Sequence, residues 1–453
     1  MSSDLTCYTA RWVLPVTSPP IRDGAVVVAG DGTIADVCPA ADAPPHARVE
    51  ALGDVALIPG LVNVHAHPEL TPFRGLLEDR PFNWWIPDLV RLKRAAALSQ
   101  EDYEVAALWA CAEALANGIT TLAATEDSAA ALHAMIVAKM RGIVYQEVFG
   151  PAPDDAGVAV ARLARKVAAL RTRETSLVRI GVSPHAPYTV SDELYRRTAG
   201  LALAEALPIA VHAAESEVEA LLVRDARGPF ADALRARGIP VHPRARSTIA
   251  LLEETGVLAA RPLVIHAIRV DEEDIAALSV AGAPVAHCPI ANARLGHGIA
   301  PVLDMLEAGI TVGLGTDSVA SNNRLDLLEE ARAAQLFQRA RTGSADTLGA
   351  ERLLRMATLD GARALGLDDR IGSLEPGKEA DLCAVALDRP HTSPVHDPFA
   401  ALILAARGSD VVLTMVRGRV LYRAGRHTEL AVTDLRPRLE AIAARLREAG
   451  KPT

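Results

Sequence analysis

Aromatic side chains and surplus positive charge are both scarce in this chain of 453 residues. Phe, Trp and Tyr together make up 4% of it, and 47 Lys and Arg residues face 56 Asp and Glu residues, for a formal charge of −9. A nucleic-acid binder needs basic groups to displace counterions and often aromatic rings to stack on bases. We therefore expect no nucleic-acid partner.

Cysteine pairs and long apolar runs are missing as well. The five cysteines lie far apart with no CxxC pair, so neither a disulfide framework nor a cysteine-rich zinc site is expected. The first residues show no basic segment followed by an apolar one, and no apolar run approaches the roughly 20 residues of a spanning helix. With 50% hydrophobic and 23% charged residues, the sequence is typical of a soluble, cytoplasmic, globular protein without a membrane partner.

The pattern of strands and helices changes twice along the chain. Residues 1–55 and the part after about Gly372 contain closely spaced strand signals, such as Ala25–Ala29 and Val411–Val416. Between them, β-branched runs alternate with Ala/Leu/Arg/Glu-rich segments of helical character. The eight runs are Ala56–Val64, Gly118–Ala124, Gly142–Val148, Val178–His185, Pro208–Glu215, Leu263–Ile268, Pro284–Ile290 and Thr311–Ser318.

Eight alternating units favour a parallel (β/α)8 barrel over an open sheet. The predicted fold is therefore α/β, with a TIM barrel over residues 56–371. Residues 1–55 and 372–430 are predicted to meet in one small β-domain. The helical spacing of Asp434–Ala449 predicts a C-terminal helix within residues 431–453.

Histidine and acidic side chains stand at the ends of four predicted strands. His65 and His67 end the first strand, and being two residues apart they point the same way. His212 ends the fifth strand, His266 the sixth and Asp317 the eighth. A lone histidine after a strand is more often a satisfied polar residue, but coincidence at four strand ends is hard to obtain by chance. Since barrel enzymes place their chemistry at the C-terminal strand ends, we expect these side chains to converge.

Nitrogen and oxygen ligands of this kind suit a divalent metal with one position left for water, with Zn²⁺ as the default and Fe²⁺ as the alternative. Such an ion lowers the pKa of its bound water from about 15.7 towards about 7. Glu215, three residues after His212, could shuttle a proton to a leaving group, or be a solvated charge. His287, at the end of the seventh strand, could hydrogen-bond the hydroxide, or be a histidine at the edge of the core.

Seven motifs resemble the amidohydrolase superfamily, and within it the branch of triazine hydrolases and aminated-heterocycle deaminases, which act on compounds such as S-adenosylhomocysteine, methylthioadenosine and aminofutalosine. They are PGLVNVHAHPELTPFRGLLED, SPHAPYTVS, VHAAES, IHA, AHCPIANARLGHG, GLGTDSVASNN and IGSLEPGKEADL. The resemblance spans nearly the whole chain in the right order. It implies a distorted (β/α)8 barrel with a β-sandwich composed from both ends of the chain.

Carried over position by position, the resemblance implies five metal ligands: His65, His67, His212, His266 and Asp317. It implies that Glu215 is the proton shuttle, that His287 is a catalytic histidine beside the metal, and that Asp317 accepts a proton from the metal-bound water. His185 in SPHAPY matches a position that contacts substrate. No lysine ends the third or fourth strand, so one metal ion per chain is expected, with Glu147 as a bridging ligand the alternative.

The segment that follows Glu78-Asp79 departs from the resemblance. Relatives acting on S-adenosylhomocysteine or methylthioadenosine tend to carry an acid there that grips the ribose, and the sequence RPFNWW contains none. This departure puts a nucleoside substrate in doubt. Arg74 and Trp85 are expected to line the substrate pocket with His185, although either could be packing or salt-bridge material.

Taken together, the residues and the resemblance predict a metal-dependent aminohydrolase. It would release ammonia from a small aminated heterocycle or a nucleoside-like substrate by attack of a metal-bound hydroxide. Ring opening of a cyclic amide and dechlorination on the same site are the alternatives within enzymes, and a metal-bound scaffold without activity is the alternative outside them. A homodimer is expected by analogy alone.

Overall fold

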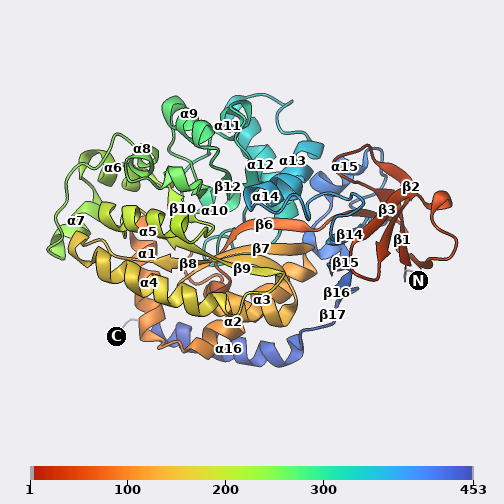
Figure 1. Cartoon of the computed structure of the whole chain (residues 1–453), viewed down its shortest axis with the longest axis horizontal. Coiled ribbons are helices and arrows are strands. Elements are labelled where there is room, and N and C mark those ends of the chain that lie inside the picture. Colours follow the sequence, from red (N-terminus) through yellow and green to blue (C-terminus); the bar gives the residue numbers. More distant parts are fainter. Residues whose placement is uncertain (1–4, 451–453) are drawn as a thin grey trace.

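Strands from both ends of the chain pair in one nine-stranded sheet (Figure 1). The computed structural model describes residues 5–450, so residues 1–4 and 451–453 of the predicted end regions lie outside the described residues. The strand order is β17-β16-β15-β14-β5-β1-β2-β3, with β4 paired to β1. The strands are β1 Leu5–Val13, β2 Ile21–Ala29, β3 Ile34–Pro39, β4 Arg48–Ala51, β5 Val55–Pro59, β14 Leu382–Ala386, β15 Val411–Val416, β16 Arg419–Arg423 and β17 Arg426–His427.

The middle of the chain holds two four-stranded parallel sheets. One has the order β6-β7-β8-β9 and the other β10-β11-β12-β13. Their strands are β6 Leu61–Ala66, β7 Ile119–Glu126, β8 Arg141–Val148, β9 Val178–Pro184, β10 Ala210–Ala213, β11 Leu263–His266, β12 Val285–His287 and β13 Val312–Leu314. The predicted mixed α/β architecture with alternating strands and helices is confirmed.

Helices fill the connections between the parallel strands, and five more, α12 to α16, follow the last of these strands, β13 (Figure 1). Those before β10 are α1 Phe82–Ala95, α2 Gln100–Ala116, α3 Ala130–Ala138, α4 Ala156–Arg171 and α5 Asp192–Ala204. Those after β10 are α6 Glu217–Asp225, α7 Pro229–Ala236, α8 Thr248–Glu254, α9 Glu272–Ala281, α10 Pro289–Arg294, α11 Val302–Glu307, α12 Leu327–Thr342, α13 Ala350–Ala357, α14 Leu359–Ala364, α15 Pro398–Ala400 and α16 Val432–Ala449. Several begin where the sequence offers a cap, as at Ser99, whose side chain forms a capping box with Asp102.

The run predicted as one strand, Ala56–Val64, is two strands that belong to different sheets. Val55–Pro59 pairs with β1 and β14, so the first strand of the parallel set begins at Leu61. The chain passes from one sheet to the other at Gly60. A Cβ at Gly60 would lie 2.2 Å from the Thr120 hydroxyl oxygen, so only glycine fits this crossing.

A buried ion-pair group joins the nine-stranded sheet to the parallel strands. Arg141, at the start of β8, donates to both carboxylate oxygens of Asp381 at 2.8 and 3.0 Å, and to Glu379 at 2.6 Å. The side chains of Arg141 and Asp381 are each 1% exposed. Both acids precede β14, so this group ties the returning end of the chain to β8.

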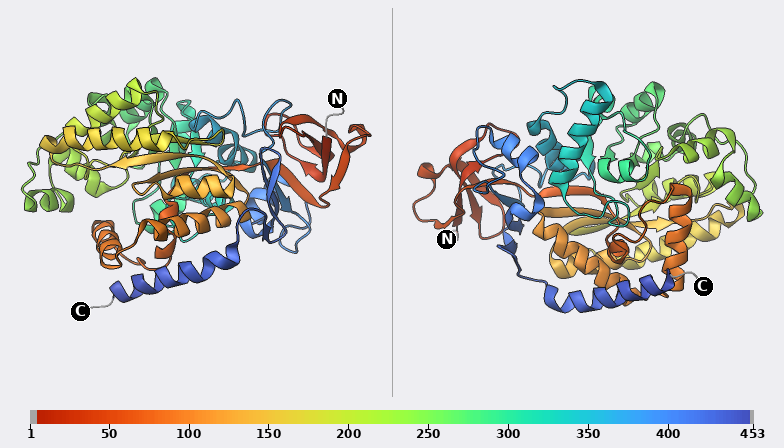
Figure 2. Two further views of the ribbon diagram at one scale, coloured as in Figure 1. Left: turned by 60° about the horizontal axis from the view of Figure 1, so that its bottom comes forward. Right: turned by 180° about the vertical axis from the view of Figure 1, so that it is seen from behind.

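The C-terminal helix α16 runs along α2, as Figure 2 shows. Arg438 and Arg445 of α16 pair with Glu101 and Asp102 of α2. The predicted helical spacing of Asp434–Ala449 is confirmed, with the helix beginning two residues earlier. Among residues 5–450, no helix has both the length and the apolar character needed to cross a membrane.

Candidate active site

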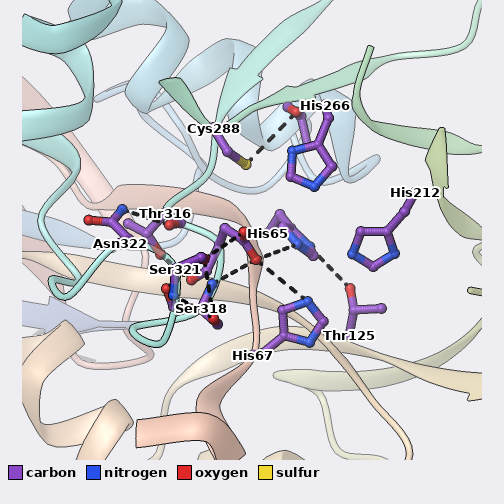
Figure 3. A network of polar contacts seen from close by, with 12 residues as sticks. His65, His67, Thr125, His212, His266, Cys288, Thr316, Ser318, Ser321 and Asn322 are labelled. Atoms are coloured by element: carbon purple, nitrogen blue, oxygen red, sulfur yellow. Dashed lines mark hydrogen bonds and ion pairs between the residues drawn. The ribbon is translucent and has the colours of Figure 1, made fainter. Parts of the chain in front are cut away.

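Five side chains come together at the C-terminal ends of β6, β10, β11 and β13: His65, His67, His212, His266 and Asp317. The ligand atoms of His65, His212 and His266 lie within 4.8 Å of one another, and so do those of His65, His67 and Asp317. In Figure 3 the four imidazole rings face a common space. The structure thus brings together every residue that the sequence predicts as a metal ligand.

Hydrogen bonds to the outer ring nitrogens orient three of these histidines. Nδ1 of His65 lies 3.2 Å from the Thr125 hydroxyl, and Nδ1 of His212 lies 3.2 Å from the His185 carbonyl oxygen. Nδ1 of His266 lies 2.9 Å from the Asn292 amide oxygen. Nε2 of each ring is left to face the common space. This is the arrangement of metal-bound histidines in general, whose second nitrogen is fixed by a neighbouring acceptor.

Asp317 is held by its own loop and faces two of the histidines. Its Oδ1 lies 3.3 Å from Nε2 of His65 and 3.6 Å from Nε2 of His67. The backbone N–H of Ser318 donates to the same oxygen at 2.7 Å, and the Ser321 hydroxyl donates to Oδ2 at 2.8 Å. One carboxylate oxygen therefore points at the histidine cluster while the other is fixed from behind.

The backbone is strained where these ligands are presented. His266 has φ of 77° and Asp317 has φ of 58°, in the left-handed region that side chains with a Cβ rarely adopt. Gly315 leaves room beside them, since a Cβ there would lie 3.0 Å from Cβ of His65. Local strain of this kind persists where surrounding contacts over-determine the conformation, and it gathers at functional sites.

Burial favours the neutral form of three of the clustered imidazoles. Loss of solvation lowers the pKa of His67 to about 3, and it also lowers the pKa values of His65 and His212. A neutral imidazole keeps the lone pair that a metal needs. Nε2 of His65 is buried and makes no hydrogen bond to any described residue. The donor set therefore fits a divalent cation held by nitrogen and oxygen.

Glu215 stands directly beside the ligand cluster. Its Oε1 lies 3.5 Å from Nε2 of His266 and 3.4 Å from Nε2 of His297, and the Tyr188 hydroxyl lies 3.5 Å from its Oε2. Burial raises the pKa of Glu215, but His266 and His297 outweigh that effect and leave the pKa below its ordinary value. A carboxylate buried next to the cluster can take up and deliver a proton there.

His287 ends β12 beside the same cluster, with 1% of its surface exposed. Burial, with His266 nearby, lowers the pKa of His287 to about 3. Neither of its ring nitrogens makes a hydrogen bond to a described residue. A buried polar group without a partner is costly, so this ring is available to a ligand of the site.

His185 borders the cluster on the side of β9. Its ring lies 4.9 Å from that of His212 between centroids, and its Nδ1 lies 2.7 Å from the Thr189 hydroxyl. Glu147 approaches Nε2 of His185 at 3.9 Å, and ligand atoms of Glu147, His185 and His212 lie within 4.8 Å of one another. Burial raises the pKa of Glu147 to about 8. Glu147 therefore lies next to the cluster, and the alternative in which it is a bridging ligand stays a prediction.

Aromatic side chains from α1 and its neighbours form a wall next to Glu215. Phe82 packs edge-on against Tyr188 and Phe230, with ring centroids 6.1 and 6.0 Å away, and Tyr188 stacks on Phe230 at 4.4 Å. Trp85 belongs to the same apolar cluster and is 8% exposed. It is thus packed in the wall, and its predicted contact with substrate stays a prediction.

Arg74, which the sequence predicts to line the substrate pocket, does not join the cluster. Its guanidinium pairs with Glu113 of α2. It lines a surface groove together with Asn117, Arg324 and Asp326, and none of the predicted metal ligands borders that groove. The partner, Glu113, lies 39 positions further along the chain.

Three residues near the site were not predicted from sequence: Asn292, Ser321 and His297. Asn292 and Ser321 fix ligands from behind, and both are amide or hydroxyl residues that are common in loops. His297 lies within the motif AHCPIANARLGHG, but the resemblance assigned it no role. Its position after a short helix that follows a strand end was the one available signal.

Residues 56–421 match the amidohydrolase family, so the chain belongs to this family of hydrolases. It is 35% identical over 402 residues to a 5-methylthioadenosine/S-adenosylhomocysteine deaminase of Syntrophobacter fumaroxidans, covering 87% of each chain. It is 32% identical over 432 residues to a 5'-deoxyadenosine deaminase of Methanothermobacter thermautotrophicus, covering 94% of this chain and 95% of the relative. The solved structure of an adenosine deaminase from Xanthomonas campestris with bound zinc superposes with a TM-score of 0.87 at 29% identity, covering 98% of this chain and 99% of the other. The resemblance seen in the motifs is confirmed.

Proposed function

We propose that this hydrolase is an aminohydrolase that releases ammonia from a small aminated heterocycle or nucleoside-like substrate. The observation that carries the proposal is Glu215, a buried carboxylate 3.5 Å from a ligand-type histidine in a cluster of four histidines and one aspartate. Deaminase names among relatives of similar length support the same reaction type. Those names also put 5'-modified adenosines first among the substrates to test.

The metal we propose is one Zn²⁺ per chain, held by His65, His67, His212, His266 and Asp317, with Fe²⁺ as the alternative. The zinc in the related adenosine deaminase structure supports this choice. Bound there, the ion would supply a water molecule that is a good nucleophile at neutral pH.

The side chains around the cluster would move the protons of the reaction. Water adds to the carbon that bears the amino group, and Asp317 accepts a proton from that water. Glu215, ionised at the start, takes the other proton of that water and delivers it to the ring nitrogen, and the proton held by Asp317 then reaches the amine, so that ammonia leaves and a C=O group takes its place. His287 donates a hydrogen bond to the attacking oxygen through a ring nitrogen that has no other described partner. The overall change is one water consumed and one ammonia released.

We further propose that the two parallel sheets close into one distorted (β/α)8 barrel. A parallel bridge between Val182 and Ile209 supports the join of β9 to β10. The join of β13 to β6 is supported by the backbone N–H of Thr316, which donates to the His65 carbonyl at 3.1 Å. Residues 61–371 would then be the barrel, and the nine-stranded sheet the proposed sandwich domain.

Ammonia release by the zinc-loaded protein tests the function. The panel holds adenosine, 5'-deoxyadenosine, methylthioadenosine, S-adenosylhomocysteine, aminofutalosine-like compounds, guanine, cytosine, pterins and aminotriazines. Ammonia from at least one compound, lost on chelation and restored by zinc, supports the proposal. Products without ammonia would point to ring opening or dechlorination, and no turnover with stoichiometric zinc would contradict hydrolytic deamination of this panel.

A further inference from the structure

His297 is a buried histidine outside the set of predicted ligands. It follows α10 in the loop GHG and is 3% exposed. Its backbone N–H donates to the Asn292 carbonyl at 2.9 Å, and the ring of Phe82 from α1 packs edge-on against it with centroids 4.4 Å apart. The ring is therefore held from two sides, by its own loop and by the helix that carries the aromatic wall.

The imidazole of His297 points at the proposed proton shuttle. Its Nε2 lies 3.4 Å from Oε1 of Glu215. The same nitrogen is buried and has no hydrogen-bond partner among the described residues. A buried N–H of this kind needs an acceptor, and the carboxylate of Glu215 is the one in reach.

The other groups around Glu215 leave a specific task for His297. Oε2 is faced by the Tyr188 hydroxyl at 3.5 Å. Oε1 is faced by His266 as well, but Nδ1 of His266 is bonded to Asn292 and its Nε2 is a ligand atom of the cluster. When His266 binds a metal it can no longer orient the carboxylate, so His297 is then the described group that fixes Oε1.

We propose that His297 is a positioning residue for Glu215, which donates from Nε2 to Oε1 and aims the carboxylate at the reacting atoms. This inference rests on the proposed function, because it assigns a partner to the group that shuttles the proton. It does not make His297 a metal ligand or a proton donor to substrate.

The test compares three substitutions in the zinc-loaded full chain. His297→Leu removes the donor, His297→Asn ends short of Oε1, and His297→Gln places an amide N–H near the position of Nε2. We expect Leu and Asn to lower kcat about 100-fold, the cost of a misplaced catalytic group, with KM unchanged. Gln should restore most of the rate. The matched control is His427→Leu, which should leave kcat unchanged, because His427 is a half-buried histidine of β17 in the nine-stranded sheet.

A double substitution shows whether His297 acts through Glu215. Adding His297→Leu to Glu215→Gln should leave the residual rate unchanged, since the group to be positioned is already gone. A further loss in that background, equal to the loss in the wild type, would overturn the proposal. A kcat equal to that of the wild type in the His297→Leu and His297→Asn variants would also overturn the proposal. The same holds for a His297→Gln variant whose kcat is as low as in those two variants. If the His297→Leu protein fails to fold, comparing kcat of His297→Asn with kcat of His297→Gln tests the same proposal.

Crystal structures separate this proposal from the proposed function. In the zinc-loaded wild type, Glu215 should lie within hydrogen-bond distance of His297, and in His297→Asn its carboxylate should leave that position. The position of the carboxylate does not depend on which substrate is turned over. If the wild type released no ammonia, the proposed function would be contradicted, but the crystal structures would still test the contact between His297 and Glu215. A carboxylate that stays in place in the Asn variant would overturn the positioning role.

Discussion

Replacing Arg141 with methionine should destabilise the protein strongly, because it breaks the buried ion-pair group between β8 and the chain end that returns to β14. Glu379 keeps Arg370, which donates to its Oε1 at 2.6 and 2.8 Å. Asp381 keeps only the backbone N–H of Arg417, at 2.8 Å, and its side chain is 1% exposed. The substitution therefore leaves one buried carboxylate without a cation, which costs about 3–5 kcal/mol in comparable cases.

Urea unfolding followed by circular dichroism and by tryptophan fluorescence measures this loss, and agreement of the two probes supports a two-state free energy. Arg436→Met is the matched control, since Arg436 and Glu440 are 72% and 64% exposed and such pairs contribute about 0.5 kcal/mol. Adding Asp381→Asn to Arg141→Met removes the orphaned charge and should recover part of the stability. An Arg141→Met protein whose free energy of unfolding lies within about 1 kcal/mol of the wild type would show that the buried carboxylate of Asp381 does not need this cation.

Three further outcomes follow from the site. Asn292→Ala removes the partner of Nδ1 of His266, a proposed metal ligand, so zinc affinity measured by competition with a chelator should fall about 10–100-fold, and unchanged affinity would contradict this orienting role. Arg74→Met should leave kcat/KM for the best substrate unchanged, since Arg74 pairs with Glu113 away from the cluster. A decrease in kcat/KM of more than about tenfold would show that Arg74 contributes to substrate binding or catalysis. Burial lowers the pKa of His67 and His287 to about 3 and that of His185 to about 4, whereas a histidine in the unfolded chain has a pKa of about 6.5. Below about pH 6.5 the unfolded chain therefore binds more protons than the folded one. The zinc-free protein should accordingly lose stability as pH falls from about 6.5 to 4 in urea unfolding, and a midpoint that does not move would show that these rings are solvated.

The site could be predicted from sequence as far as strand ends define it. His65 and His67 end one strand, and His212, His266 and Asp317 end others, so a barrel of parallel strands predicts their meeting. The strands β10 to β13 are shorter than the β-branched runs that predicted them. β10 ends at Ala213 and β11 at His266, because Ala214 and His266 turn into the left-handed region.

The parts that could not be predicted depend on long-range contacts. Arg74 pairs with Glu113, and Arg141 pairs with acids some 240 positions later, which local patterns do not report. Phe82 reaches His297 because α1 lies over the ends of the parallel strands, a placement that no periodicity encodes. The crossing at Gly60 was missed because two apolar strands in a row read as one.

Glu215 is proposed to move the proton at a one-metal centre that deaminates its substrate. Measuring kcat for ammonia release and bound zinc in the wild type and in Glu215→Gln side by side tests this role. We expect one zinc per chain in both proteins and a rate about 10²–10⁴-fold lower in the variant, as expected when a general acid–base is removed. A variant that holds zinc and releases ammonia at the wild-type rate would contradict it.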